Sequence, residues 1–320
     1  MPYMKANTYW GIAAESTYGT AASISTFTPI QTPKITPNVK WLPANDLRGS
    51  PVTTYDQVTG VRHDTFTGKS YLFSDVTPNV IRSVLGGVDA VASVSASVWT
   101  HTIGLINQPN TGSQPPSYTL LLDSVDNTYQ MTAARAVSLS LSFSADAVVE
   151  ASLDYTGNIS TTVASVSVNE SAQTFIPAWG CAASISGASV AVVEKMTLDI
   201  KRGTAPIHTL GQQGPYVNFA GPIGVTGSLT FIVEAGEPYY AEALTHSQLP
   251  MVLNFIDPVT NYQIMFNMHN VQLMDPVIDT GQAYITLDAK FEAIANTTNA
   301  IYPGFSPISC VVTNGISTPY

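Results

Sequence analysis

The sequence predicts an all-β protein that carries one short helix in each of two related halves. Apolar and polar residues alternate over many segments, which is the pattern of half-buried antiparallel strands. Stretches rich in Gly, Pro, Ser and Asn separate these segments, as turns and loops do. Several blocks of sequence occur twice in the same order, so we expect the chain to contain one fold twice.

The strand pattern is clearest in four segments. In residues 137–144, Val, Leu and Phe alternate with Ser, so one face is expected to enter a core while the other presents hydroxyl groups. The same alternation occurs in residues 196–201, 225–233 and 283–292. These segments favour antiparallel strands with one polar face.

Two short helices are predicted between the strands. Thr77 is a plausible N-cap, Pro78 suits the first helical position, and Gly86 follows the last apolar residue of the segment. The second helix repeats this order of residues, with Glu237 and Pro238 before the run 239–244. Each half is therefore expected to contain one helix.

Three blocks carry the internal repeat. Residues 67–78 resemble 226–238, residues 123–131 resemble 257–264, and residues 151–155 resemble 285–289. The offsets are 227 − 68 = 159 and 257 − 123 = 134, so the first half holds about 25 extra residues, near 86–116. We expect two domains, 1–163 and 164–320, joined in the Ser/Thr-rich stretch 157–170.

The composition excludes several classes of function. A chain of 320 residues suffices for two domains with their own cores. Charged residues are 11% of the chain, against about 25% in ordinary globular proteins. A Ser/Thr-rich sandwich face or extensive contacts between copies of the chain would each explain this. The net charge of −10 argues against nucleic-acid binding, because DNA would be repelled.

A search for reactive chemistry finds little. The five histidines have no metal-ligand spacing, and no hydrolase or nucleotide-binding motif is present. Neither an enzyme nor a cofactor or metal site is expected. Cys181 and Cys310 are expected to be free thiols. No signal peptide and no run of about 18 apolar residues is found, so we expect a protein that is made and kept in a cytoplasm.

The carboxylates of Glu150 and Asp154 are four residues apart on a predicted strand and should therefore share a face. Asp288 and Glu292 occupy nearby positions in the second half. A solvated strand face, an acidic pore lining and a pair of glycosidase carboxylates are the alternatives for these residues. Their spacing does not say which way the face points.

The opening stretch 9–21 contains Gly11, Glu15 and the triplet Tyr18-Gly19-Thr20. It resembles the start of tail tube proteins from long-tailed, siphovirus-like bacteriophages. The strand 225–231 with its following helix, and the late segment 285–293, are similar to the strand-then-helix unit and the closing strand of that family.

This resemblance implies two tandem tail-tube-type domains, each a β-sandwich or small barrel flanked by a helix. It implies a structural virion protein whose rings stack into the hollow tail tube through which DNA passes during ejection. Since the chain is duplicated, three chains per ring with pseudo-sixfold symmetry are expected. The implied partners are further copies, a tape-measure protein, tail terminator and tip proteins, and passing double-stranded DNA that is not bound specifically. Assembly would take place in the bacterial host cytoplasm, without membrane insertion.

On this interpretation the important residues lie on surfaces. Ring stacking is assigned to the N-terminal arm through Ala22, the loops 42–60 and 107–116 and the tail 301–320. The candidates for the lumen are Glu150, Asp154, Asp288 and Glu292, and those for ring stacking are Trp10, Tyr18, Asp46, Arg48, Tyr55, Asn110, Tyr302 and Phe305. A decoration or baseplate protein and a carbohydrate-binding β-sandwich are the alternative functions.

Overall fold

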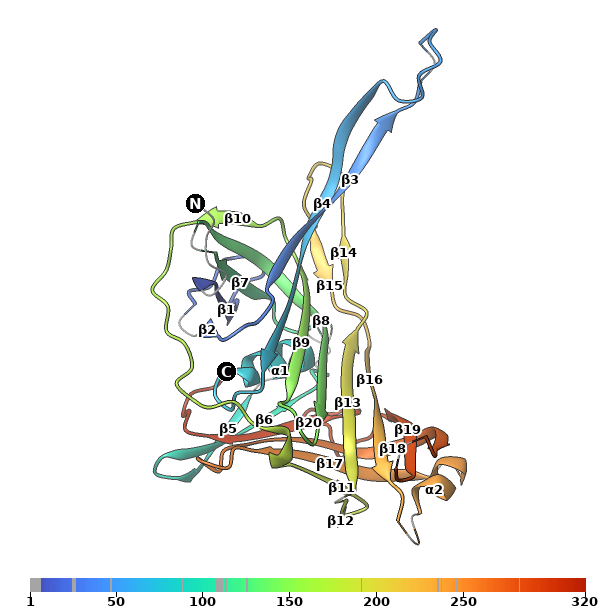
Figure 1. The fold of residues 1–320 in the computed structure, drawn as a ribbon. Coiled ribbons are helices and arrows are strands. Elements are labelled where there is room, and N and C mark those ends of the chain that lie inside the picture. The colour runs from blue at the N-terminus through green and yellow to red at the C-terminus, as the bar shows by residue number, and fades with distance from the viewer. Residues whose placement is uncertain are drawn as a thin grey trace.

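The computed structural model describes residues 7–24, 27–46, 48–87, 89–107, 112, 114–124, 126–190, 192–234, 236, 238–245, 247–281 and 283–320. These residues form a predominantly β structure, which confirms the predicted fold class (Figure 1). The strands of the first half are β1 (Tyr9–Ala14), β2 (Phe27–Thr28), β3 (Lys34–Ala44), β4 (Asp56–Tyr71), β5 (Ala90–Ser95), β6 (Val98–Gly104), β7 (Tyr118–Asp123), β8 (Thr128–Ser144), β9 (Glu150–Gly157) and β10 (Thr161–Val163). Those of the second half are β11 (Cys181–Ile185), β12 (Ala188–Ser189), β13 (Val193–Arg202), β14 (Ala205–Ile207), β15 (Val217–Phe219), β16 (Ile223–Ile232), β17 (Gln248–Ile256), β18 (Gln263–Asp279), β19 (Thr286–Ala293) and β20 (Ser309–Asn314).

The two halves pair their strands in the same order. In the first half the antiparallel neighbours run β1-β7-β8-β9-β4-β3. In the second half they run β11-β17-β18-β19-β16-β13. A helix follows the fifth strand of this order in each half, α1 (Thr77–Leu85) after β4 and α2 (Tyr239–Thr245) after β16.

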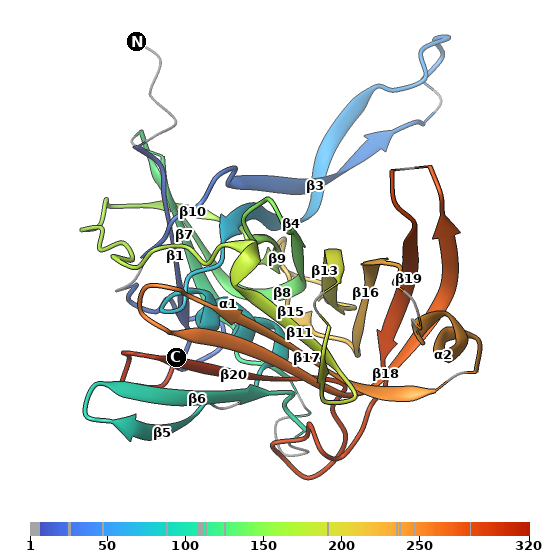
Figure 2. The same cartoon turned by 60° about the horizontal axis from the view of Figure 1, so that its bottom comes forward.

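One continuous sheet joins the halves, because β8 also pairs with β13. The resulting order is β3-β4-β9-β8-β13-β16-β19-β18, which we call the main sheet. Its strands follow one another in a curved arrangement (Figure 2). The halves are therefore connected by backbone hydrogen bonds as well as by the chain itself.

A second layer covers one face of the main sheet. The first parts of the long strands β8 and β18 leave the main sheet and pair with β7 and β10, and with β17 and β20. The ladder between β7 and β8 is irregular here, and Ala133 adopts a positive φ of 52°. Such bulges bend a strand, which lets one strand take part in two layers. The core lies between the layers.

Helix α1 is largely buried, and its apolar residues Val80, Ile81, Val84 and Leu85 belong to the core. The predicted Pro at the start and the Gly after the end are confirmed, with Gly86 in the left-handed conformation at φ 79°. The predicted N-cap is wrong. The cap position is Val76, because the Thr77 hydroxyl instead accepts the N–H of Phe73 at 2.9 Å in the turn before the helix. Neither helix of the described residues is long and apolar enough to cross a bilayer.

The predicted long loop 42–60 is shorter than expected. Strand β3 continues to Ala44 and β4 begins at Asp56, so only the connection between them is a turn. Both strands extend beyond the body of the protein as a projecting hairpin (Figure 1). The stretch 203–222 contains a small two-stranded sheet, β14 and β15. Most of 108–113 lies outside the described residues.

Candidate functional site

The face of the main sheet that is turned away from the second layer carries mostly hydroxyl groups. Directly opposite residues of antiparallel strands point to the same face. Ser140 lies opposite Ser152 on one side and Asp199 on the other, and Thr226 follows Asp199 across the sheet. The residues that alternate with these, such as Leu139 and Leu141, are buried. We call the hydroxyl-bearing side the polar face.

All four carboxylates predicted for the lumen lie on the polar face. Asp154 lies opposite Ser138 and accepts its hydroxyl hydrogen bond at 2.7 Å, and Glu150 is 3.3 Å from the amine of Lys69. Asp288 accepts a hydrogen bond from Thr230 at 2.5 Å. The prediction that the members of each pair share a strand face is confirmed.

The polar face carries cations as well as anions, so it is not the purely acidic surface that one of the sequence alternatives described. The pairing places Asp199 on the same face as the four predicted carboxylates. Its Oδ1 accepts the hydroxyl hydrogen of Ser140 at 2.5 Å. Lysines of the same face are Lys34, Lys69, Lys195, Lys201 and Lys290. Because the lysines and carboxylates named here are similar in number, they leave little net charge on the polar face.

These lysines were missed as site residues although a sequence signal exists. Lys195, Thr197, Asp199 and Lys201 alternate with apolar residues along β13, and alternation places them on one face. The alternation predicted the strand, but the charged side chains on its polar face were not assigned to the site.

The tip of the projecting hairpin gathers three of the predicted stacking residues. Arg48 donates from Nε to Asp46 at 2.6 Å and lies over the ring of Tyr55, 5.1 Å from its centroid. The Tyr55 hydroxyl donates to the carbonyl of Ser50 at 3.0 Å. All of these contacts are exposed, so they shape the tip but contribute little to the stability of the body.

Trp10 is not a surface residue, which corrects its prediction as a stacking residue. Its side chain is completely buried and stacks on Phe66 with ring centroids 5.2 Å apart. An indole of this size fills the core because β1 pairs with β7 inside the fold. The sequence did not reveal this burial, since a tryptophan near the start of a chain suits an exposed arm equally well.

Tyr18 serves a contact within the chain. Its ring lies under the guanidinium of Arg135, 5.4 Å from the centroid, and its phenol oxygen accepts the N–H of Asn218 at 2.7 Å. Asn218 belongs to β15, and its carbonyl accepts from Arg135 at 2.7 Å. The small sheet of β14 and β15 is thereby held against the first half.

The remaining stacking candidates are scattered. Asn110 lies outside the described residues. Tyr302 is half-buried, whereas the ring of Phe305 is 63% exposed and its carbonyl accepts a hydrogen bond from Asn107 at 2.9 Å. The predicted tail is part of the fold, because β20 pairs with β18 and β6.

The main sheet ends in two free strand edges. Among the described residues, β3 pairs only with β4, and the last part of β18, residues 273–279, pairs only with β19. The second edge exposes apolar side chains, with Val277 57% and Ile278 52% exposed. Unpaired edges of this kind are templates for another chain.

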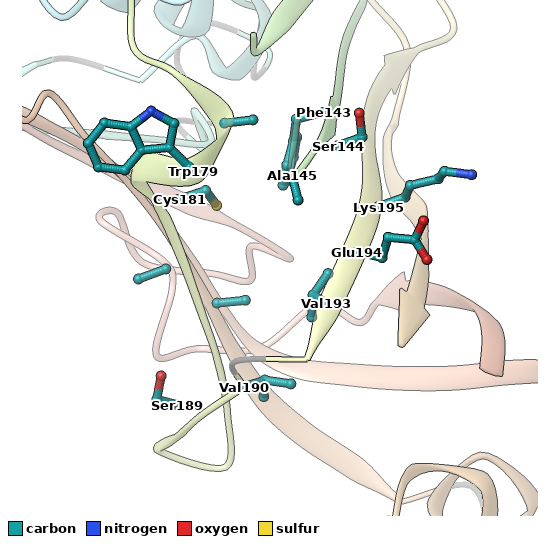
Figure 3. Close-up of a pocket in the computed structure, with 13 residues that line it drawn as sticks. Phe143, Ser144, Ala145, Trp179, Cys181, Ser189, Val190, Val193, Glu194 and Lys195 are labelled. Carbon is teal, nitrogen blue, oxygen red and sulfur yellow. The ribbon is translucent and has the colours of Figure 1, made fainter. Parts of the chain in front are cut away.

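A pocket of about 310 Å³ lies between the end of β8, strand β11 and the start of β13 (Figure 3). Phe143, Cys181 and Val193 line it, and Trp179 stands at its margin. Burial raises the pKa of the Cys181 thiol to about 12, so the sulfur is not a thiolate nucleophile. Within the described ranges, no His, Cys, Asp and Glu side chains gather in a way that could hold a metal ion.

A polar sheet face of low net charge, two free strand edges and a projecting hairpin define a structural protein that associates through its surfaces. The comparison with known families agrees: the family described as "Phage tail tube protein" matches residues 5–293. The chain belongs to this family, and it is a component of a phage tail. No curated protein matches the chain. The family is structural rather than enzymatic, and it implies assembly into a tube with other tail proteins.

Proposed function

We propose that three copies of this chain form a closed ring and that stacked rings form the tail tube of a siphovirus-like phage. The observation that carries the proposal is the main sheet with a free edge at each end. Eight strands per chain give 3 × 8 = 24 strands in a ring of three chains, with no edge left open. Closed rotational symmetry satisfies such edges without an open filament.

The shared pairing order supports a duplication in which each half replaces one subunit of a sixfold ring. Both halves use six strands in the same sequence of neighbours and insert a helix at the same place. Under this proposal the boundary near residue 163 separates two tandem tail-tube domains. The contact between β8 and β13 is then the internal version of a contact between subunits.

The polar face would line the lumen. The opposite face of the main sheet is covered by the second layer and by α1, so only the polar face is free to meet water and passing DNA. Hydroxyl groups and balanced charges offer DNA no basic stripe to bind. Glu150, Asp154, Asp288 and Glu292 would belong to this lining, together with the lysines between them.

The projecting hairpin would reach a neighbouring ring, because its tip extends beyond the body of the protein (Figure 1). Asp46, Arg48 and Tyr55 are then stacking residues. Tape-measure, terminator and tip proteins are the proposed partners in the tail, which assembles in the bacterial cytoplasm and releases DNA through the tube.

The test is electron microscopy of the purified protein across concentrations, combined with the mass of any ring from light scattering. A ring of three chains has a mass of 3 × 34.0 = 102 kDa, and a ring of six has 204 kDa. Hollow rings or tubes with the smaller repeat mass support the proposal. Six chains per ring would retain the tube and refute the replacement of two subunits by one chain. A protein that stays monomeric at high concentration would refute the tube.

A further inference from the structure

The contact between β8 and β13 gives the geometry of an edge-to-edge junction in this fold. Leu141 lies opposite Leu198, and Ser142 lies opposite Thr197. The two leucines are 1% and 0% exposed. An apolar pair on the core face and a polar pair on the polar face thus hold the halves together.

The two halves can be aligned residue by residue on a shared bulge. Tyr118 and Leu120 lie opposite Ala134 and Met131, and Leu249 and Met251 lie opposite Val271 and Met268. The offset between the long strands is therefore 268 − 131 = 137, which corrects the offset of 134 that the sequence blocks gave for this region. It makes residue 141 correspond to 278, and residue 142 to 279.

The same alignment identifies the strand of the first half that corresponds to β13. Leu198 lies opposite Gly227, which lies opposite Phe291 and, beyond it, Leu273. In the first half, Ala136 corresponds to Leu273, because 273 − 137 = 136. Ala136 lies opposite Tyr155, Tyr155 lies opposite Phe66, and Phe66 lies opposite Ile35. Ile35 thus corresponds to Leu198, and Lys34 to Thr197.

These correspondences match chemically complementary residues on the two free edges. Ile278, the counterpart of Leu141, is 52% exposed, because no strand lies beside it as β13 lies beside Leu141. Ile35 is half-buried against the core. Asp279 and Lys34 are both exposed and carry opposite charges. Asp279 also accepts the N–H of Gly281 at 2.8 Å, which holds its carboxylate at the end of the strand.

Two pockets give an independent observation. The 310 Å³ pocket includes Cys181, Val193 and Glu194, and its further wall is the end of β8 around Phe143 (Figure 3). A pocket of about 900 Å³ in the first half is lined by residues that include Thr8, Ile30 and Gln31.

The alignment equates these two linings. The offset between β3 and β13 is 198 − 35 = 163, so residues 193 and 194 correspond to residues 30 and 31. Ile185 lies opposite Met251 and Ile12 lies opposite Leu120, so the offset between β1 and β11 is 185 − 12 = 173. Residue 181 therefore corresponds to residue 8. The larger pocket has no counterpart of the β8 wall. The end of a second copy's β18 is the element that corresponds to it.

We propose that β3 of one copy pairs antiparallel with the free edge of β18 of a second copy, with Ile35 opposite Ile278 and Lys34 opposite Asp279. The inference rests on the proposed ring and names its contact. It is a heterologous junction, since each copy offers a different edge at its two ends. Closing it buries Ile278 and completes the open pocket beside Ile30.

Cross-linking between two variants tests the register, and each variant carries one introduced cysteine besides the buried Cys310. Lys34→Cys and Asp279→Cys, each in a Cys181→Ala background, are mixed under assembly conditions and oxidised. Directly opposite residues of antiparallel strands lie within disulfide range. We expect covalent dimers on a non-reducing gel. Lys40→Cys replaces Lys34→Cys as the control, because it is exposed on the same strand but about 20 Å further along, and it should give none.

A charge exchange tests the same contact without new cysteines. Lys34→Glu and Asp279→Lys alone should each raise the concentration needed for assembly by up to about fivefold, the range of an exposed ion pair. The double variant should return toward wild type. Tubes without the cross-link, or a double variant no better than the single ones, would overturn the register and leave the proposed function standing. Failure of the wild-type chain to form rings would overturn the proposed function itself.

Discussion

Ile278→Ala and Leu141→Ala form a matched pair of perturbations that separates assembly from folding. The two side chains occupy corresponding positions, but Leu141 is covered by β13 whereas Ile278 is 52% exposed on a free edge. Truncating the first removes a contact within the folded chain. Truncating the second removes, under the proposed junction, a contact between chains.

The expected magnitudes follow from burial. A buried Leu→Ala change costs about 2–5 kcal/mol of unfolding free energy, so Leu141→Ala should be strongly destabilised. Full burial of an isoleucine contributes about 1.5–3 kcal/mol, so covering the exposed half of Ile278 contributes about 1 kcal/mol per chain. This amount raises the critical concentration for assembly about fivefold. The stability of the unassembled Ile278→Ala chain should change by less than about 1 kcal/mol.

Urea unfolding of the unassembled protein measures the change in the free energy of unfolding. Sedimentation of tubes across a concentration series measures the change in the critical concentration for assembly. Leu141→Ala should lower the urea midpoint yet assemble near the wild-type critical concentration wherever it remains folded. A wild-type critical concentration for Ile278→Ala would refute the burial of this side chain between copies. An undiminished midpoint for Leu141→Ala would refute the magnitude assigned to the internal junction.

Three further predictions concern the core, an acidic group and the hairpin. Trp10→Ala should lower the free energy of unfolding by about 3–5 kcal/mol, measured by urea unfolding. Burial alone raises the pKa of Asp64, but hydrogen bonds from Arg62 and Ser160 outweigh it and hold the pKa below its ordinary value. The stability from Asp64 is therefore present above the unfolded pKa of about 3.9 and is lost as pH falls through the folded pKa. Asp64→Asn should flatten the fall in urea midpoint between pH 6 and pH 3. Replacing 45–55 with Asn-Gly should close the hairpin at Ala44 opposite Asp56 and leave single rings by electron microscopy, without stacked tubes.

Each of these three has a result that would contradict it. A Trp10→Ala midpoint equal to wild type would show that the stack on Phe66 contributes nothing. Equal pH profiles for the wild type and Asp64→Asn would remove Asp64 from the acid response. Normal tubes without residues 45–55 would exclude the hairpin tip from stacking.

Much of the local structure could be predicted from the sequence, because its signals are short-ranged. The alternation in residues 137–144 and 196–201 identified β8 and β13, and the four-residue spacing of Glu150 and Asp154 placed both on one face of β9. Pro78 and Gly86 bounded the first helix to within one residue. Side-chain period and backbone preference act within a few residues, so they can be read without the fold.

Other features required the fold. The loop predicted for 42–60 is shorter, since the pairing of β3 with β4 includes 42–44 and 56–59. Trp10 was assigned to the surface, but it lies in the core and stacks on Phe66. Phe66 lies far away in sequence, so no local pattern revealed this contact. The lysines of the polar face were left out because their relation to Glu150 and Asp154 arises only through strand pairing, by β4 within the first half and by β13 between the halves.

The sequence by itself located four strands and two helices, and it determined which faces of those strands are apolar. Only the tertiary structure decided that β8 joins β13, that the polar faces of both halves merge, and that one edge of β3 and the end of β18 stay free. The physical reason is that strand pairing satisfies backbone N–H and C=O groups, which every residue type other than proline carries alike. Side chains specify which face of a strand is buried, whereas the choice of neighbour depends on long-range packing that no local pattern encodes.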